Sequence, residues 1–346
     1  AEEMMHGRIA QQGKDFSNDE LLPLFNAMRL NKVSREQLED YLYARHVVKD
    51  NVNARLEAIN PDLPNNKALS GMNDATANAI LKNANTKVME SLAKHVDGMV
   101  NATRDLMVSY GLESQLVIDE LRKAYPHYIP LGREGIDILH GYTTGAGLSV
   151  RGSTIMQRGG SSVKAENLLA NVAQARDQIV ARGEKNRVDQ AVAALLMLHP
   201  NEDIAKLDKP TSISFPDPIT GVMVVRPGNL ANYQVPTIRR LGPPTIDPVT
   251  KKLIPGVMTT YVDPQYKGRD NVVNFRVKGV DYAIVFNEQN ERAMEIAHGM
   301  KNIGTEQLGI ITRTVAPFTR YLAAINTQYN PIFGVVNFIR DAQFAM

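Results

Sequence analysis

The stretch AENLLANVAQARDQIVARGEKNRVDQAVAALLML, residues 165–198, decides the fold class of this chain. Its apolar residues recur every three or four positions, which places them on one face of a helix. The residues that carry this spacing are Leu168, Leu169, Val172, Ala175, Ile179, Val188, Val192, Leu195 and Leu196. Gly183 falls inside the pattern, and because glycine is a common site of helix bending, we expect the helix to bend or divide there.

The segment from residue 34 to residue 61 has the same spacing. Ser34 followed by Gln37 is the pattern of a capping box, and apolar residues then recur until Asn60-Pro61 ends the run. We expect one long amphipathic helix between these two signals.

A second long helix is predicted between residues 71 and 111. Asn73 or Asp74 supplies its N-cap, and Gly111 occupies the position that commonly follows a helix C-terminus. Two such long helices can pack as an antiparallel pair. A shorter helix is expected from about Ser114 to Ala124.

A β-rich module is predicted at residues 211–286. Prolines are spread there between short apolar runs, which is typical of edge strands and turns. Two alternating runs between residues 272 and 287 flank Lys278-Gly279, a pattern that predicts a hairpin. Helix resumes near Asn287. The predicted fold is therefore mainly α, with long helices and a smaller β-rich module.

These signals divide the chain into four regions. They are a helical region at 1–125, a proline-braced strap with a glycine-rich loop and helices at 126–210, the β-rich module at 211–286, and C-terminal helices at 287–346. The sequence begins without an initiator methionine, and its helical pattern has no stop signal at the other end. We therefore expect a piece of a longer polypeptide whose last helix continues.

The composition is that of a soluble globular protein, with 43% hydrophobic and 22% charged residues among 346. A formal net charge of +2 requires no polyanionic partner, so nucleic acid is left open as a partner. The absence of cysteine excludes disulfides, thiolate metal sites and cysteine nucleophiles. No apolar run approaches the roughly 20 residues that span a bilayer, so no membrane span is expected.

No pattern of residues predicts catalysis. The seven histidines form no close pair of the kind that binds zinc, and the glycine-rich stretch 141–153 lacks the ending of a phosphate-binding loop. His127 is the one tempting general base, yet the sequence places no nucleophile or orienting acid beside it. Glu113, Asp119 and Glu120 are expected on a solvated helix face. We therefore predict no enzyme activity, no cofactor and no metal site.

The stretch AYPHYIPLGREG, residues 124–135, predicts a rigid strap behind the short helix. Pro126 disfavours the α conformation at the residue before it and so ends the helix there. Pro130 restricts its own preceding residue in the same way. Tyr128 and the pair Ile129 and Leu131 can then anchor an extended segment on the helical layer. Arg133 can pair with an acid or cap carbonyl groups.

The same stretch resembles a motif of large phage and prophage proteins that are named for P-L-x-R-F-G. Pro130, Leu131, Arg133 and Gly135 match that motif, and Glu134 replaces its phenylalanine. Three further stretches resemble the same group in order: SGMNDATANAIL at 70–81, RGSTIMQRGGSS at 151–162 and YNPIFGVVNFIRDA at 329–342. The last is the most specific, because it fixes together Asn330, Pro331, Phe333, Asn337, Arg340 and Asp341.

The residues of the last stretch can also be interpreted from their own chemistry. Asn330 suits the cap of a helix that has Pro331 in its first turn. Apolar residues then offer contacts, and polar residues offer hydrogen bonds, to a neighbouring helix. An interaction surface and an intrachain core both agree with this pattern.

The resemblance implies a structural, non-catalytic segment of an internal virion protein that takes part in DNA ejection. It implies other virion proteins and further copies of the chain as partners, a location in the virion, and delivery into the host cell. The motif residues, together with Tyr128, are the candidate interaction residues. Two alternatives stay open: a mobile-element protein that is delivered with DNA and protects it against host defence, and a hydrolase-type enzyme domain.

Overall fold

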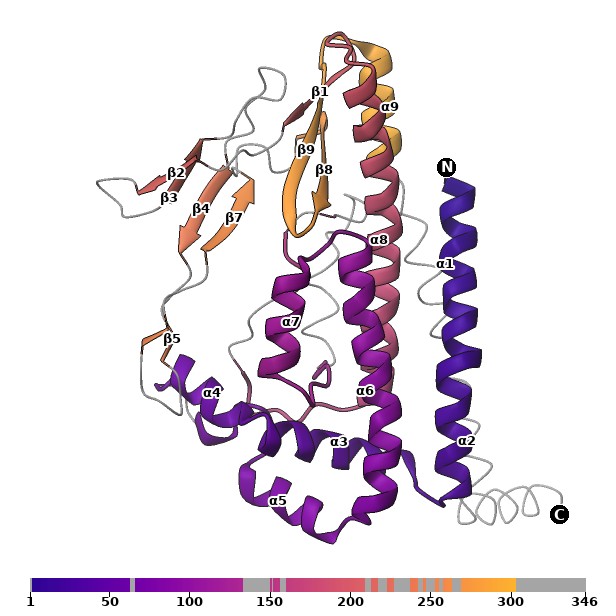
Figure 1. Ribbon diagram of the computed structural model, residues 1–346, viewed down its shortest axis with the longest axis vertical. Coiled ribbons are helices and arrows are strands. Elements are labelled where there is room, and N and C mark those ends of the chain that lie inside the picture. The colour runs from indigo at the N-terminus through magenta and orange to yellow at the C-terminus, as the bar shows by residue number, and fades with distance from the viewer. Residues whose placement is uncertain are drawn as a thin grey trace, which may run out of the picture.

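The computed structural model describes residues 2–62, 66–132, 150, 152–155, 160–208 and 269–302, together with the backbone of short strands at 213–216, 223–226, 237–241, 245–246, 253–254 and 258–262. Figure 1 shows a helical body with a small antiparallel sheet at one end. The prediction of a mainly α fold with a smaller β module is confirmed.

The helices run from one end of the described chain to the other. An α-helix, a short π-helical segment at Ser17–Leu21 and a second α-helix follow one another without a turn at the start. A 3-10 turn covers Asn66–Ala68. The α-helices are α1 Glu2–Phe16, α2 Leu22–Leu30, α3 Arg35–Lys49, α4 Val52–Ile59, α5 Asp74–Asn83, α6 Thr86–Ser109, α7 Gln115–Ala124, α8 Leu168–Leu198 and α9 Glu291–Asn302.

The strands form antiparallel sheets. β1 Ala205–Asp208 pairs with β9 Val280–Phe286, which pairs in turn with β8 Val272–Val277, so the order of the first sheet is β1-β9-β8. A second sheet has the order β2-β3-β4-β7. Its strands are β2 Ile213–Pro216, β3 Met223–Arg226, β4 Thr237–Leu241 and β7 Met258–Val262, and a separate pair joins β5 Thr245–Ile246 to β6 Leu253–Ile254. The sequence does not predict β1.

The predicted helix caps are present. The Gln37 amide N–H donates to Ser34 Oγ at 3.2 Å and the Ser34 N–H donates back to Gln37 Oε1 at 2.9 Å, which is the expected capping box. Asn73, rather than its neighbour, caps α5 by accepting from the Thr76 N–H. Gly111 has φ +70°, as the position after α6 requires.

The two predicted long helices are each divided. The first breaks between α3 and α4, where Asn51 takes the left-handed conformation at φ +52°. Asparagine tolerates that conformation better than most residues, so a polar residue within an otherwise helical run can end the helix. The second breaks at Ala84, which is extended between α5 and α6. In Figure 1, α3 lies across α6 and above α5.

The expected division of the helix at Gly183 is wrong, because α8 runs through this residue without interruption. A Cβ atom at Gly183 would lie 2.1 Å from Cδ2 of Tyr110. Glycine at this position therefore lets the Tyr110 ring pack directly on the helix backbone. The predicted hairpin is confirmed, since Lys278 and Gly279 both have positive φ in the turn between β8 and β9.

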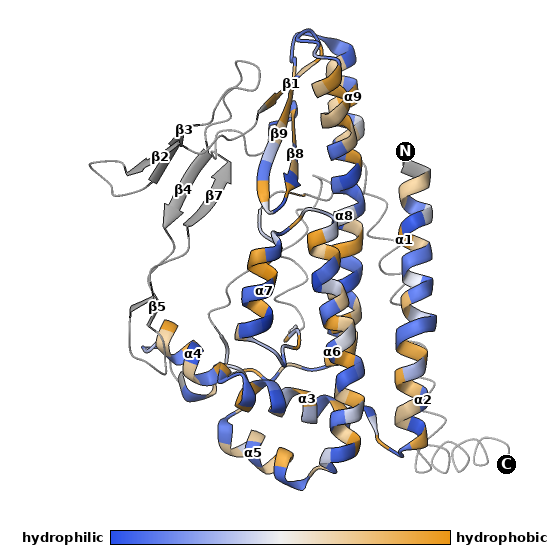
Figure 2. Cartoon of the chain, viewed as in Figure 1, coloured by the Kyte–Doolittle hydropathy of each residue, from blue (hydrophilic) through white to orange (hydrophobic). Residues whose placement is uncertain are grey.

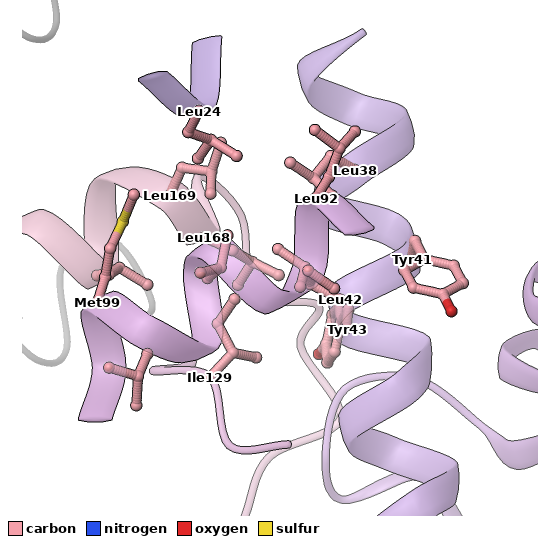
Figure 3. Close-up of a cluster of buried hydrophobic side chains, with 14 of the residues drawn as sticks. Leu24, Leu38, Tyr41, Leu42, Tyr43, Leu92, Met99, Ile129, Leu168 and Leu169 are labelled. Atoms are coloured by element: carbon pink, nitrogen blue, oxygen red, sulfur yellow. The ribbon is translucent and has the colours of Figure 1, made fainter. Parts of the chain in front are cut away.

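The described residues form two main hydrophobic cores, and α8 takes part in both. Figure 3 shows the larger one, the bundle core, which joins α2, α3, α6, the start of α8 and Ile129. The smaller one, the sheet core, packs β8, β9 and α9 against the last turns of α8, with Phe275, Ile284 and Ala297 inside it. Hydropathy along α8 is mixed, as Figure 2 shows, because polar residues lie between the two cores.

Candidate functional site: the strap and the polar junction

The strap, residues 125–131, follows α7 and lies on the bundle core. α7 ends at Ala124, before Pro126, as predicted. Ile129 is 1% exposed inside the bundle core and Leu131 packs against the same cluster, whereas Tyr128 is 39% exposed. Of the predicted interaction residues, the structure thus places Tyr128, Pro130 and Leu131 together. Arg133, Gly135, Asn330, Pro331, Phe333, Asn337, Arg340 and Asp341 lie outside the described residues.

A buried carboxylate joins the strap to α3. His46 Nδ1 lies 2.7 Å from Asp50 Oδ2, one helical turn away. The other oxygen, Oδ1, accepts a hydrogen bond from the backbone N–H of His127 at 3.3 Å. Asp50 is 2% exposed, so both contacts are shielded from water and a single side chain bridges the two segments.

Cations and aromatic rings complete the attachment. The Arg55 guanidinium lies 4.5 Å from the ring centroid of Tyr125, and that of Arg104 lies 5.3 Å from the centroid of Tyr128. Arg104 also donates to the Tyr125 carbonyl oxygen at 3.3 Å, and the Tyr128 ring meets His46 edge-on at 5.6 Å. Such cation–π contacts each contribute about 0.5–2 kcal/mol, depending on their exposure. Helices α3, α4 and α6 therefore all hold the strap.

The described contact that positions the candidate base His127 is its backbone N–H, which donates to Asp50. Its ring nitrogen Nδ1 is buried and has no hydrogen-bond partner among the described residues. Burial lowers the pKa of His127, and the positive charge of Arg45 lowers it further. His46 and Asp50 form an acid–imidazole pair of the type that orients a general base. His46 is only 4% exposed, however, between the rings of Tyr125 and Tyr128.

An ion cluster borders the strap on α3 and α6. Arg45, 2% exposed, donates to Asp97 Oδ2 at 3.0 Å and to Glu90 Oε2 at 3.4 Å. Burial alone would raise the pKa of Glu90, but hydrogen bonds from Lys49 and Tyr41 outweigh it and hold that pKa at about 2. The cluster thus fixes α3 on α6 through the two terminal nitrogens of Arg45, which bond to Glu90 and Asp97.

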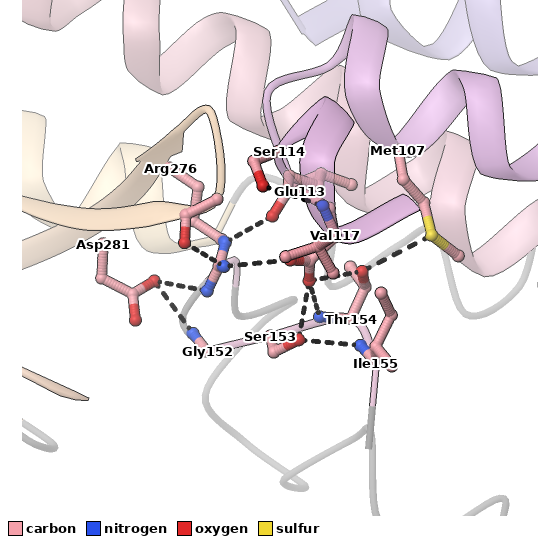
Figure 4. A network of polar contacts seen from close by, with 12 residues as sticks. Met107, Glu113, Ser114, Val117, Gly152, Ser153, Thr154, Ile155, Arg276 and Asp281 are labelled. Atoms are coloured by element: carbon pink, nitrogen blue, oxygen red, sulfur yellow. Dashed lines mark hydrogen bonds and ion pairs between the residues drawn. The ribbon is translucent and has the colours of Figure 1, made fainter. Parts of the chain in front are cut away.

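A second group, which we call the polar junction, lies where the helical body meets the hairpin (Figure 4). It comprises Glu113, Asp281, Arg276 and the segment 152–154. Arg276 is 3% exposed and donates to the Leu112 carbonyl at 2.7 Å and to Asp281 Oδ1 at 2.9 Å. Its guanidinium also lies 3.6 Å from Glu113 Oε2. Buried charges of opposite sign therefore tie β8 and β9 to the end of α6.

The same Glu113 carboxylate holds the segment 152–154. Its Oε1 atom accepts from the Thr154 N–H at 2.6 Å and from the hydroxyls of Ser153 and Thr154, both at 2.7 Å. The expectation of a solvated Glu113 is wrong, because this side chain is 4% exposed, whereas Asp119 and Glu120 are exposed as expected. The partners of Glu113 lie 40 or more residues away, so no local pattern identifies it.

The middle of α8 forms a polar waist beside the junction, with Glu184, Lys185, Asn186 and Asp189 all buried. Asn186 accepts from the Arg276 N–H at 2.7 Å and donates to the Arg276 carbonyl at 2.9 Å, as an edge strand would. Glu184 accepts from the Tyr110 hydroxyl at 2.9 Å. The waist therefore fixes the register of α8 against both α6 and β8.

Asp189 is the unsatisfied member of the waist. It is wholly buried, and neither carboxylate oxygen receives a hydrogen bond from the described part of the chain. Burial raises the pKa of Asp189 to about 8, against the attraction of Lys185 one turn earlier. Burial likewise lowers the pKa of Lys185, whose Nζ donates to the Lys301 carbonyl at 3.3 Å.

Comparison with known proteins adds no family: no family model, curated protein or solved structure matches the chain. Within the described ranges, no three histidine, aspartate or glutamate side chains gather as a metal site would require. A helix with the length and apolar character of a membrane span is also lacking among those residues.

Proposed function

We propose that this chain is a structural segment of a large phage internal virion protein, which takes part in DNA ejection and acts through protein–protein assembly. The strap carries the proposal. Pro130 and Leu131, which match the phage motif, belong to a segment that three helices grip through Asp50, Arg55 and Arg104. This placement supports a bracing role for the motif-bearing stretch.

The polar junction supports the same role. A buried network that is broken by removing one partner typically costs about 3–5 kcal/mol, so it strongly penalises any other arrangement of its elements. Here the network couples the end of α6, the β8–β9 hairpin and α8 through Arg276 and Asn186. A part that must fit other proteins in a particle needs such a fixed shape. The proposed partners are other virion proteins, and the proposed locations are the virion and then the host cell.

Quantitative mass spectrometry of purified particles tests the proposal. We expect peptides of this chain in a constant ratio to the capsid protein through successive gradient steps. An abundant host protein serves as the contamination control, since its ratio falls with each step. Peptides that are present in infected cells but lost from the particles at the control's rate would overturn the proposal.

A further inference from the structure

The last two turns of α8 are apolar on every side. Residues 191–198 read AVAALLML, without a polar residue. A helix at a protein surface normally keeps a polar face, and one that is apolar all round is normally buried. Among the described residues, one side of this run is covered, because Ala193 is buried in the sheet core and Val192 and Leu196 pack against it.

The other side of the run faces water. Leu195, Met197 and Leu198 are 58%, 60% and 75% exposed. We call these three residues the apolar tip. Single exposed apolar residues are common, but three within the last turn of one helix form a patch of the kind that marks an interaction site.

Exposed acidic residues lie at the same end of the described chain as the apolar tip. The turn after α8 and the turn before α9 are joined there, since the Asn287 N–H donates to the Ile204 carbonyl and the Asn290 side chain donates to the Asp203 carbonyl, both at 2.9 Å. Figure 1 shows both turns at the same end as the last turn of α8. The exposed acidic residues of these turns and of the start of α9 are Glu202, Asp203, Glu288, Glu291 and Glu295.

Few cations offset these acids. Lys206 is ion-paired with Glu202 at 3.5 Å, which leaves Arg292 as the exposed cation on the first turn of α9. This end of the described chain therefore presents the apolar tip together with an excess of exposed carboxylates, which we call the acidic rim. A second copy in a two-fold contact would set one acidic rim against the other, which is unfavourable.

We propose that the apolar tip binds an amphipathic helix of a partner protein whose apolar face is flanked by lysine and arginine. The apolar face of such a helix would cover Leu195 and Leu198, as in helix-in-groove recognition, and its cations would meet the acidic rim. This inference does not depend on a virion role, because it rests on the surface of the chain alone. It names the chemistry of the partner.

A labelled peptide tests the proposal by fluorescence anisotropy. The probe is a synthetic amphipathic helix of about four turns, with leucine on one face and lysine beside it. We expect the full chain to bind it, and the double variant Leu195→Gln/Leu198→Gln to bind at least about tenfold more weakly. The matched control is Leu30→Gln/Leu116→Gln, which removes two leucines that are 79% and 73% exposed elsewhere.

Charge is tested separately. We expect Glu291→Lys/Glu295→Lys to weaken binding of the lysine peptide by at least about threefold, with the difference shrinking as salt screens the rim. A peptide with glutamate in place of lysine should bind more weakly to the parent chain. Far-UV circular dichroism confirms that each variant is folded.

Four results would contradict the proposal. Equal binding by the parent and the Leu195→Gln/Leu198→Gln variant, or no binding by either, would show that the tip is not the site. Equal binding of the lysine and glutamate peptides would remove the role of the rim. A dimer in light scattering that Leu198→Gln dissolves would assign the tip to contacts between copies of the chain.

Discussion

The buried carboxyl group of Asp189 makes a specific prediction for the variant Asp189→Asn. The folded-state pKa of Asp189, about 8, lies above the unfolded value of about 3.9. Below the unfolded pKa both states carry the proton, so the group costs nothing. As pH rises from about 4 to about 8, the unfolded chain releases the proton while the folded chain keeps it, and stability is lost. Asparagine carries no such proton and removes this loss.

The size of the effect follows from the same shift. One proton changes the free energy of unfolding by at most about 1.4 kcal/mol per pH unit, so roughly four units give a ceiling on the order of 5 kcal/mol. The pKa of about 8 already includes the attraction of Lys185, and relaxation of the folded chain around the buried charge lowers that figure. We therefore expect Asp189→Asn to match the parent within about 1 kcal/mol near pH 4.5 and to be more stable by about 2–4 kcal/mol near pH 8.

Urea unfolding followed by far-UV circular dichroism at several pH values measures this difference. Glu120→Gln is the matched control, because it removes an exposed carboxylate on α7 and should follow the parent at every pH. A parent-minus-variant difference that stays constant between pH 4.5 and 8 would refute the reasoning, since Asp189 would then hold the same charge in both states. Lys185→Met should steepen the loss of stability, because it removes the attraction that favours ionised Asp189.

Three further predictions concern packing and charge. Gly183→Ala should lower the free energy of unfolding in urea by about 1–3 kcal/mol or more, because its Cβ meets the Tyr110 ring. Gly98→Ala is the control, since open space surrounds its Cβ position, and it should raise the free energy of unfolding by up to about 1 kcal/mol. Equal effects of the two substitutions would contradict this packing. Glu113→Gln should lower the free energy of unfolding by about 3–5 kcal/mol, because it removes one of the carboxylates beside the buried Arg276 guanidinium. An unchanged urea midpoint would show that the polar junction is not buried in solution. Asn51→Ala should lower the free energy of unfolding by about 1 kcal/mol and so lower the urea midpoint, because alanine disfavours the left-handed conformation that separates α3 from α4. A raised midpoint would contradict that conformation.

Features that depend on near neighbours in the sequence could be predicted. The caps at Ser34 and Asn73 join residues three positions apart, and the hairpin turn at Lys278-Gly279 needs only two residues with positive φ. The end of α7 before Pro126 is of the same kind. In each case the physical cause lies within a few residues of the feature itself.

Features that depend on distant partners could not be predicted. Gly183 has the sequence signature of a bend, but the Tyr110 ring that packs on it comes from the end of α6. Glu113 has the signature of a solvated acid, and only the folded chain brings Arg276 and Thr154 to it. The candidate site is therefore predicted in part, through the strap's prolines and tyrosines, while the carboxylate of Asp50 beneath the strap appears only in the structure.

The unbroken course of α8 has a mechanical consequence. A helix of 31 residues is about 46 Å long, and this one packs in both cores as one continuous helix. Force or torque applied at its far end by a bound protein would travel to the bundle without a joint to absorb it. Sliding of α8 along its own axis would first have to break the hydrogen bonds between Asn186 and the backbone of β8. The two ends of α8 are therefore expected to move together.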